Sequence, residues 1–204
     1  MAFKIKSLHY TNSIGTDLTV YLSESTIWKD ANKEGMIVNM PSYEIFTSPD
    51  FRKTEGIVYS SRPLVYNGKI IDEFYIKFKD GKAVEYDAKV GCDLLGSILT
   101  SDEQSGYLGE AALVNYDSPI SNTGKVFYTT LFDENASCHL ALGNGFPNTI
   151  KDGNKLSKEK LMECGINQSK IHVDFMIGTK DLNIVAQTFD GKNIQIFKDG
   201  NFCI

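Results

Sequence analysis

Residues 69–90 read KIIDEFYIKFKDGKAVEYDAKV, two alternating runs around an Asp-Gly pair. Phe74, Ile76 and Phe78 recur at every second position, which places them on one face of a strand. Asp80-Gly81 supplies the positive φ that a tight hairpin turn requires. The stretch therefore predicts an antiparallel hairpin with one face in the core and the other in water.

Similar patterns on both sides of this hairpin predict many strands and few helices. The further strands are expected at residues 3–10, 17–22, 57–66, 110–116, 125–131, 171–177, 182–189 and 193–198. Helices are expected at 91–99, at 158–164 behind a Ser157 N-cap, and within 131–143, between an Asp133 N-cap and Gly143. We expect one α+β domain over residues 1–204, dominated by antiparallel or mixed, barrel-like sheet.

The composition excludes several classes of partner. A net charge of -5 over 204 residues argues against nucleic acid, which requires a basic surface. No apolar run approaches the ~20 residues of a membrane span, so no membrane partner is expected. Cys92, Cys138, Cys164 and Cys203 are scattered, which is typical of reduced thiols and predicts a cytoplasmic protein.

His172-Val173-Asp174 interrupts an apolar run that is predicted to be a strand. Side chains at i and i+2 share a strand face, so the imidazole and the carboxylate point the same way. Burying both without partners would cost roughly 2–7 kcal/mol each. A divalent metal such as zinc would satisfy them, and so would backbone groups and water.

The other two histidines have simpler explanations. His139 falls in the helix predicted within 131–143, among small and apolar residues, where a packed, hydrogen-bonded imidazole is the usual finding. His9 precedes Tyr10 near the N-terminus, and we expect it to be structural or solvated.

Two glutamates stand in unusually apolar surroundings. Glu44 precedes Ile45-Phe46-Thr47, and Glu110 lies within Leu108-Gly109-Glu110-Ala111-Ala112-Leu113-Val114. Most glutamates are solvated, but one that is embedded in an apolar strand is buried only when paired or metal-bound.

Five segments give the chain a specific resemblance. They are Asn39-Met40-Pro41-Ser42-Tyr43-Glu44-Ile45-Phe46-Thr47, 108–114, Asp117-Ser118-Pro119-Ile120-Ser121, 131–143 and 172–178. Together they resemble the aminopeptidase T and aminopeptidase S family of metallo-aminopeptidases over nearly the whole chain.

This resemblance implies a site with two divalent metal ions. Its metal ligands would be Glu44, Glu110, His139, His172 and Asp174. Glu44 and His139 would hold one ion, His172 and Asp174 the other, and Glu110 would bridge them. Zinc suits these donors, and cobalt, magnesium or manganese are substitutes. The family removes single residues from peptides with a free N-terminus, and it suggests a homodimer.

A general base is still required for peptide hydrolysis. Glu134 and Asp133 are near His139 in sequence and could act there or support the ligands, while helix capping is the simpler explanation, favoured for Asp133.

The chain departs from the family in two respects. Phe146 stands where relatives carry a tyrosine that is thought to take part in the site, so the ring is kept and the hydroxyl is lost. Full-length relatives are about twice as long and carry an N-terminal α/β domain, so the chain resembles their C-terminal, metal-binding catalytic domain. Two alternatives to an active aminopeptidase follow: a catalytically weak or inactive metal-binding domain, and a β-rich interaction module.

Overall fold

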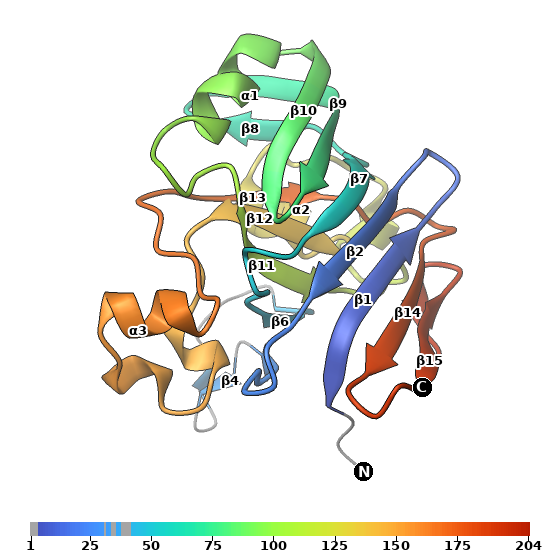
Figure 1. The fold of residues 1–204 in the computed structure, drawn as a ribbon. Coiled ribbons are helices and arrows are strands. Elements are labelled where there is room, and N and C mark those ends of the chain that lie inside the picture. Colours follow the sequence, from blue (N-terminus) through green and yellow to red (C-terminus); the bar gives the residue numbers. More distant parts are fainter. Residues whose placement is uncertain (1–3, 31, 34–35, 38–41) are drawn as a thin grey trace.

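Two antiparallel sheets organise the chain (Figure 1). The computed structural model describes residues 4–30, 32–33, 36–37 and 42–204, so Asn39, Met40 and Pro41 of the first motif lie outside the described residues. The nine-stranded sheet runs β10-β9-β7-β2-β1-β14-β15-β16, with β8 paired to β9. The five-stranded sheet runs β13-β12-β11-β6-β3, and β4 pairs only with β5 among the described strands.

The strands of the nine-stranded sheet are β1 (Ile5–Thr11), β2 (Asp17–Tyr21), β7 (Glu55–Tyr59), β8 (Leu64–Tyr66), β9 (Lys69–Lys79), β10 (Lys82–Val90), β14 (Asn183–Thr188), β15 (Asn193–Lys198) and β16 (Asn201–Phe202). The five-stranded sheet contains β3 (Lys29–Asp30), β6 (Ile45–Thr47), β11 (Leu108–Leu113), β12 (His139–Gly143) and β13 (His172–Met176). The small pair is β4 (Asn32–Lys33) and β5 (Met36–Ile37). Three α-helices, α1 (Cys92–Leu99), α2 (Thr130–Glu134) and α3 (Lys158–Glu163), and three short 3-10 helices at Ser121–Thr123, Pro147–Thr149 and Gly153–Lys155 complete the described elements.

The α+β class with dominant antiparallel sheet is confirmed, but the sheets are not barrel-like. A closed barrel needs its two end strands to pair. Along the described strands, β10 and β16 end the larger sheet at opposite edges, and β13 and β3 end the smaller one. Among the described residues, none of the helices is both long enough and apolar enough to cross a membrane.

The predicted hairpin at 69–90 is confirmed as β9 and β10. Phe74, Ile76 and Phe78 are buried. Asp80 and Gly81 both have positive φ, at 50° and 78°. A Cβ on Gly81 would lie 1.9 Å from the Phe51 carbonyl oxygen, so this turn accepts only glycine at its second position.

The strand that was predicted at 57–66 is divided, and the one at 125–131 is absent. Residues between β7 and β8 form a bend. Residues 125–129 are irregular because the Asp133 carboxylate accepts hydrogen bonds from the Phe127 and Thr129 amides, at 2.9 and 3.1 Å. These bonds hold the segment in a turn that begins α2.

The helix predicted within 131–143 is also wrong beyond α2, because residues 139–143 form β12. Asp133 lies inside α2, and its carboxylate accepts a hydrogen bond from the amide of Thr129, the residue that precedes this helix. It does not cap a helix over His139. A short apolar run does not distinguish a buried helix from a buried strand. Here β11 and β13 pair with both edges of β12, and this pairing selects the strand.

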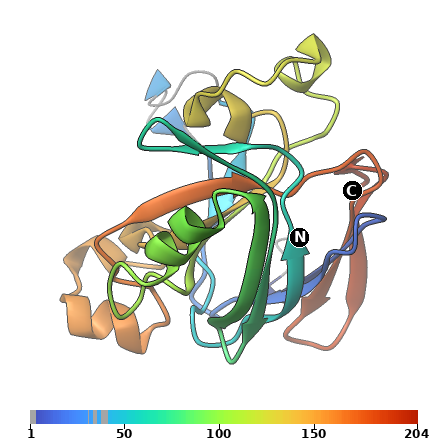
Figure 2. The ribbon, with the colours of Figure 1, turned by 90° about the horizontal axis from the view of Figure 1, so that it is seen from above.

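The other helices agree with the sequence. α1 begins and ends within one residue of the prediction, and α3 begins behind Ser157, whose Oγ accepts from the Lys160 amide. Gly165 follows α3 with a φ of 91°. In Figures 1 and 2, α3 and the β14–β15 hairpin lie at opposite ends of the molecule.

The hydrophobic core fills the space between the two sheets. Leu140, Leu142, Val173 and Phe175 contribute one face of the five-stranded sheet to it. The opposite face of that sheet is therefore free to carry other chemistry.

Candidate metal centre

Five ionisable side chains project from the face of the five-stranded sheet that is turned away from the core. Glu44 immediately precedes β6 and the other four lie on β11, β12 and β13. These four strands lie side by side in the centre of Figure 1. Directly opposed residues share a face, and so do residues two apart. The register pairs Glu110 with Ala141 and Ala141 with Asp174. The same rule places all five residues on this face, and we call them the cluster: Glu44, Glu110, His139, His172 and Asp174.

Small residues leave space between the cluster side chains. Ala112, Ala141 and Gly143 occupy the same face at positions between the ionisable groups. The register shifts between Leu108 and Glu110, which marks a β-bulge at Gly109. A Cβ at Gly109 would lie 2.3 Å from the Asn144 carbonyl oxygen, so glycine permits the close approach that aims Glu110.

The cluster consists of two groups that share Glu110. His172 Nε2 lies 3.1 Å from Glu110 Oε2 and 3.1 Å from Asp174 Oδ1. His139 Nε2 lies 3.1 Å from Glu44 Oε2. One ligand atom from each of Glu44, Glu110 and His139 lies within 4.8 Å of the others, and the same holds for Glu110, His172 and Asp174.

Main-chain carbonyls fix the orientation of both imidazoles. His172 Nδ1 lies 2.7 Å from the Asn144 carbonyl oxygen, and His139 Nδ1 lies 3.2 Å from that of Ser137. A carbonyl oxygen only accepts hydrogen bonds, so each Nδ1 carries its hydrogen and donates it. Both Nε2 atoms are thereby directed toward the carboxylates, as is usual for metal-binding histidines.

The contacts at Nε2 require a positive charge. A neutral Nε2 and an ionised carboxylate both present lone pairs, so they approach to 3.1 Å only around a proton or a metal ion. Glu44 Oε2 is buried and makes no hydrogen bond within the described residues, despite its short distance to His139. A buried oxygen of this kind is suited to a cation that it shares with the imidazole.

The metal-free cluster holds this charge as protons. Burial opposes charging of His139, but Glu44, Glu110 and Asp174 outweigh it and raise the pKa of His139 to about 10. Burial likewise opposes charging of His172, whose pKa Asp174 and Glu110 raise to about 11. Burial raises the pKa of Glu110.

Glu134 adds a further carboxyl group beside the cluster. It is 9% exposed at the end of α2, which packs against β13. Burial, with the nearby charges of Asp174, Glu44 and Glu110, raises its pKa to about 8 against the opposing effect of His139. Within the described residues its carboxylate has no hydrogen bond or ion pair. The neighbouring charges that shift its pKa most belong to residues of the cluster.

Phe146 lies against the cluster with its ring. The Phe146 and His172 ring centroids are 4.9 Å apart, and the Phe46 ring lies 5.3 Å from Phe146. The Ser48 hydroxyl accepts a hydrogen bond from the Phe146 amide at 2.8 Å. Asn135 Oδ1 accepts a hydrogen bond from the Tyr43 amide at 2.8 Å, which holds the backbone next to Glu44 in place.

The structure thus brings together all five side chains singled out from the sequence, with Glu134 and Phe146 next to them. His139 is buried and hydrogen-bonded, as expected, although on a strand. His9 lies elsewhere, on β1, where it contacts Asp17 at 2.7 Å and is partly solvated. The roles of Phe46 and of the Asn144 carbonyl were missed, because no local pattern announces a contact made across strands.

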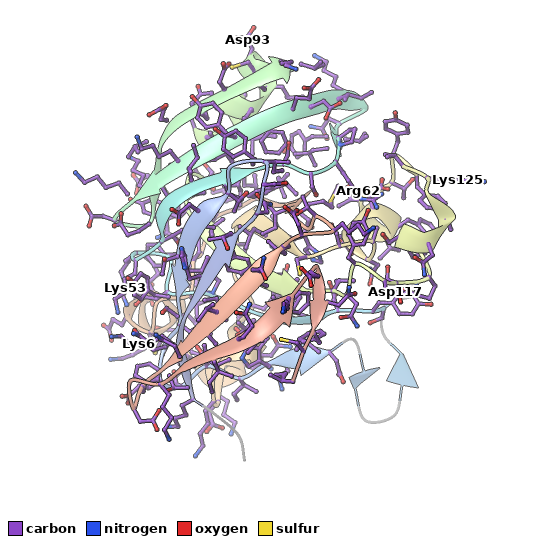
Figure 3. The ribbon with its side chains drawn as sticks, turned by 90° about the vertical axis from the view of Figure 1, so that its right-hand side faces the viewer. Lys6, Lys53, Arg62, Asp93, Asp117 and Lys125 are labelled. Carbon is purple, nitrogen blue, oxygen red and sulfur yellow. The ribbon has the colours of Figure 1, made fainter. Side chains whose placement is uncertain are left out.

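Among the described residues, most ionisable side chains outside the cluster are exposed, and some of them are labelled in Figure 3. Exposed examples labelled there are Lys6, Lys53, Asp93, Asp117 and Lys125. The cluster, with three acids and two imidazoles on a largely buried sheet face, therefore differs from most ionisable residues of the described chain.

This donor set is typical of proteins that bind divalent metals. The chain belongs to the thermophilic metalloprotease family (M29), whose pattern it matches over residues 2–202. It is 47% identical to aminopeptidase AmpS of Bacillus subtilis (strain 168) over 201 residues, which are 96% of this chain and 49% of that protein.

One solved structure agrees with this assignment. Wild-type AmpT from Thermus thermophilus superposes with a TM-score of 0.90 at 36% identity, over 98% of this chain and 50% of that one. A dioxygenase from Pseudomonas putida KT2440 shares the fold alone, with a TM-score of 0.62 at 12% identity, over 98% of this chain and 55% of that one. The chain spans about half the length of the curated relatives that it matches.

Proposed function

We propose that the cluster binds two divalent metal ions and that the chain is the metal-binding, catalytic domain of an aminopeptidase. The observation that carries this proposal is the pair of oriented imidazoles whose Nε2 atoms meet three carboxylates, with Glu110 common to both groups. Three carboxylates supply negative charge that nearly balances two divalent ions, whereas the protein alone balances it by protonating both histidines.

Each ion would have its own ligands. Glu44 and His139 would hold one, His172 and Asp174 the other, and Glu110 would bridge them. Zinc suits two imidazoles and three carboxylates, and cobalt, magnesium or manganese would be accepted by the same donors. Bound metal of this kind polarises a scissile carbonyl and lowers the pKa of a water molecule.

The chain's own residues would then orient and exchange protons. Donation from the two Nδ1 atoms to main-chain carbonyls keeps both Nε2 atoms available. The Glu134 carboxyl, whose pKa is raised to about 8 in the metal-free protein, lies beside the cluster and would exchange a proton there. Glutamine has the size of glutamate but cannot exchange a proton, so Glu134→Gln should retain metal and lose turnover.

The substrates would be peptides with a free N-terminus. Support comes from the relatives, which are named aminopeptidases, and from family membership. We infer from the same relatives that the chain corresponds to their C-terminal half. Cytoplasmic location and a homodimer belong to the same proposal.

Native mass spectrometry after dialysis against zinc tests the metal proposal. Two ions per chain in the parent protein, and fewer in Glu110→Gln, are expected. A chain that remains metal-free, and whose melting temperature ignores both zinc and chelator, would instead be an interaction module with packed histidines.

A catalytically weak metal-binding domain is the second candidate, and Phe146 favours it. Its ring lies beside His172 without the hydroxyl that relatives are expected to use. Hydrolysis of leucyl-p-nitroanilide separates the two. The zinc-loaded chain, alone and joined to the N-terminal half of an M29 aminopeptidase, should release nitroaniline if it is an enzyme domain, whereas retained zinc without hydrolysis in either form supports the weak domain.

A further inference from the structure

Glu44 is held differently from the other four members of the cluster. Glu110, His139, His172 and Asp174 lie on strands, where ladder hydrogen bonds to neighbouring strands fix the backbone. Glu44 lies ahead of the paired residues of β6, a strand of only three residues. Its carboxylate nevertheless reaches His139 Nε2 at 3.1 Å from a largely buried position. A contact other than strand pairing therefore holds this segment.

The side-chain amide of Asn135 supplies this contact. Asn135 Oδ1 accepts a hydrogen bond at 2.8 Å from the main-chain amide of Tyr43, the residue before Glu44. Tyr43 is 46% exposed, so packing of its ring contributes little, and the main-chain hydrogen bond does the holding. The two residues are 92 positions apart in the sequence, and their bond joins the segment ahead of β6 to the end of α2.

Asn135 is itself fixed by further hydrogen bonds. Its Nδ2 donates to the Leu131 carbonyl oxygen of α2 at 3.1 Å, and its own carbonyl oxygen accepts from the Ser118 hydroxyl at 3.2 Å. Because an amide oxygen only accepts and an amide nitrogen only donates, Tyr43 and Leu131 together allow one orientation of the side chain. Asn135 is fully buried, and losing either partner would leave a buried polar atom unpaired. Oδ1 is therefore presented to Tyr43 from a rigid position.

We propose that Asn135 is a positioning residue, which holds Glu44 against His139 and thereby sets the occupancy of one of the two metal ions. The inference rests on the proposed function and assigns to Asn135 control over one half of that site. Asn135 would touch neither metal nor substrate, and would act through the backbone of Tyr43 and Glu44.

The two groups of the cluster depend on this contact to different degrees. Glu110, His172 and Asp174 lie on β11 and β13, and strand pairing holds them without help from Asn135. The other group includes Glu44, whose backbone is held through Asn135. Loss of the Asn135 bond should consequently weaken binding of one ion and spare the other, whereas a merely structural role would affect both ions or neither.

Zinc titration of two variants that break the same hydrogen bond from opposite sides tests the proposal. Asn135→Ala removes the acceptor, and Tyr43→Pro removes the amide hydrogen while leaving Asn135 in place. Isothermal titration calorimetry of the parent protein should show two zinc ions per chain. Each variant should bind one ion with parent affinity and the other about 10- to 100-fold more weakly, which is the usual cost of removing a group that supports a metal ligand.

Two matched controls isolate the hydrogen bond. Tyr43→Ala removes the ring but keeps the amide hydrogen, so both ions should bind as in the parent. Asn201 makes the same kinds of contact on β16, accepting from the Asp117 amide and donating to the Asp199 carbonyl oxygen, both at 2.9 Å. Asn201→Ala should therefore keep both affinities. Tyr43→Pro changes an exposed residue and serves if Asn135→Ala does not fold.

The outcomes distinguish the inference from the proposed function. Parent affinity for both ions in Asn135→Ala or Tyr43→Pro, equal weakening of both ions, or the same loss in Tyr43→Ala would overturn the positioning role and leave the metal site standing. A parent chain that binds fewer than two zinc ions would overturn the two-metal proposal, and the positioning role with it.

Discussion

In the nine-stranded sheet, β9 buries Phe74, Ile76 and Phe78 and turns Lys77 to solvent, whereas β12 of the five-stranded sheet is buried at every residue. The first strand needs one apolar face, because water covers the other. The second has a core on one face and the cluster on the other. A strand buried on both faces can therefore carry ionisable groups when those groups satisfy one another or share a cation.

Glu110→Gln should have the largest effect on metal binding, because both groups of the cluster share this residue. We expect loss of zinc affinity well beyond the 10- to 100-fold that removal of a supporting partner costs. Metal content by mass spectrometry measures it. The control is Glu85→Gln on β10, an exposed carboxylate paired with Lys77, which should leave metal content unchanged. Equal loss in both variants would contradict a special role for Glu110.

Leu140→Ala tests the opposite face of β12. Leu140 is fully buried, so we expect a loss of about 2–5 kcal/mol in the free energy of unfolding. Val84→Ala on β10, where the side chain is 56% exposed, should change it by less than about 0.5 kcal/mol. Urea denaturation of the metal-free proteins measures both. Similar values for the two variants would show that β12 does not bear more of the core than β10.

Phe146→Tyr would restore a hydroxyl beside His172. Hydrogen-bond donors at a developing oxyanion contribute ~10²–10³ in rate, so turnover of leucyl-p-nitroanilide should rise by up to this factor. Zinc content must stay the same for the comparison to hold. Unchanged turnover at equal metal content would show that the site does not use the hydroxyl.

Metal affinity should increase with pH. His139 and His172, with pKa values of about 10 and 11, are protonated at neutral pH, and a metal must displace these protons. For each proton displaced, affinity should rise about tenfold per pH unit between pH 6 and 9. Calorimetric zinc titrations in buffers of different ionisation enthalpy measure the release. Zinc uptake without proton release would show that it binds elsewhere.

Strands with one buried and one exposed face are easier to predict from the sequence than the strands around the cluster. Alternation in β9 and the Asp80-Gly81 turn are local signals, so the hairpin is predicted with nearly correct ends. His172 and Asp174 were also placed correctly on one strand face. Each of these inferences needs only neighbours in sequence.

The remaining features depend on partners distant in sequence. A helix was predicted over His139 because Asp133 and Gly143 have the character of residues that begin and end one, whereas the structure has a strand there that is buried at every residue. The strand predicted at 125–131 is absent because the Asp133 carboxylate accepts hydrogen bonds from two amides of this segment, and strand propensity does not register such contacts. The three residues of β6 form a strand only because β11 and β3 pair with them.

The order β13-β12-β11-β6 joins positions 172–174, 139, 110 and 44, so cluster residues from both ends of this span meet only after all four strands have paired. A partly folded chain would offer isolated donors with weak affinity. Tight metal binding would consequently require that the five-stranded sheet has formed. The bound ions would then stabilise the folded sheet and slow its unfolding.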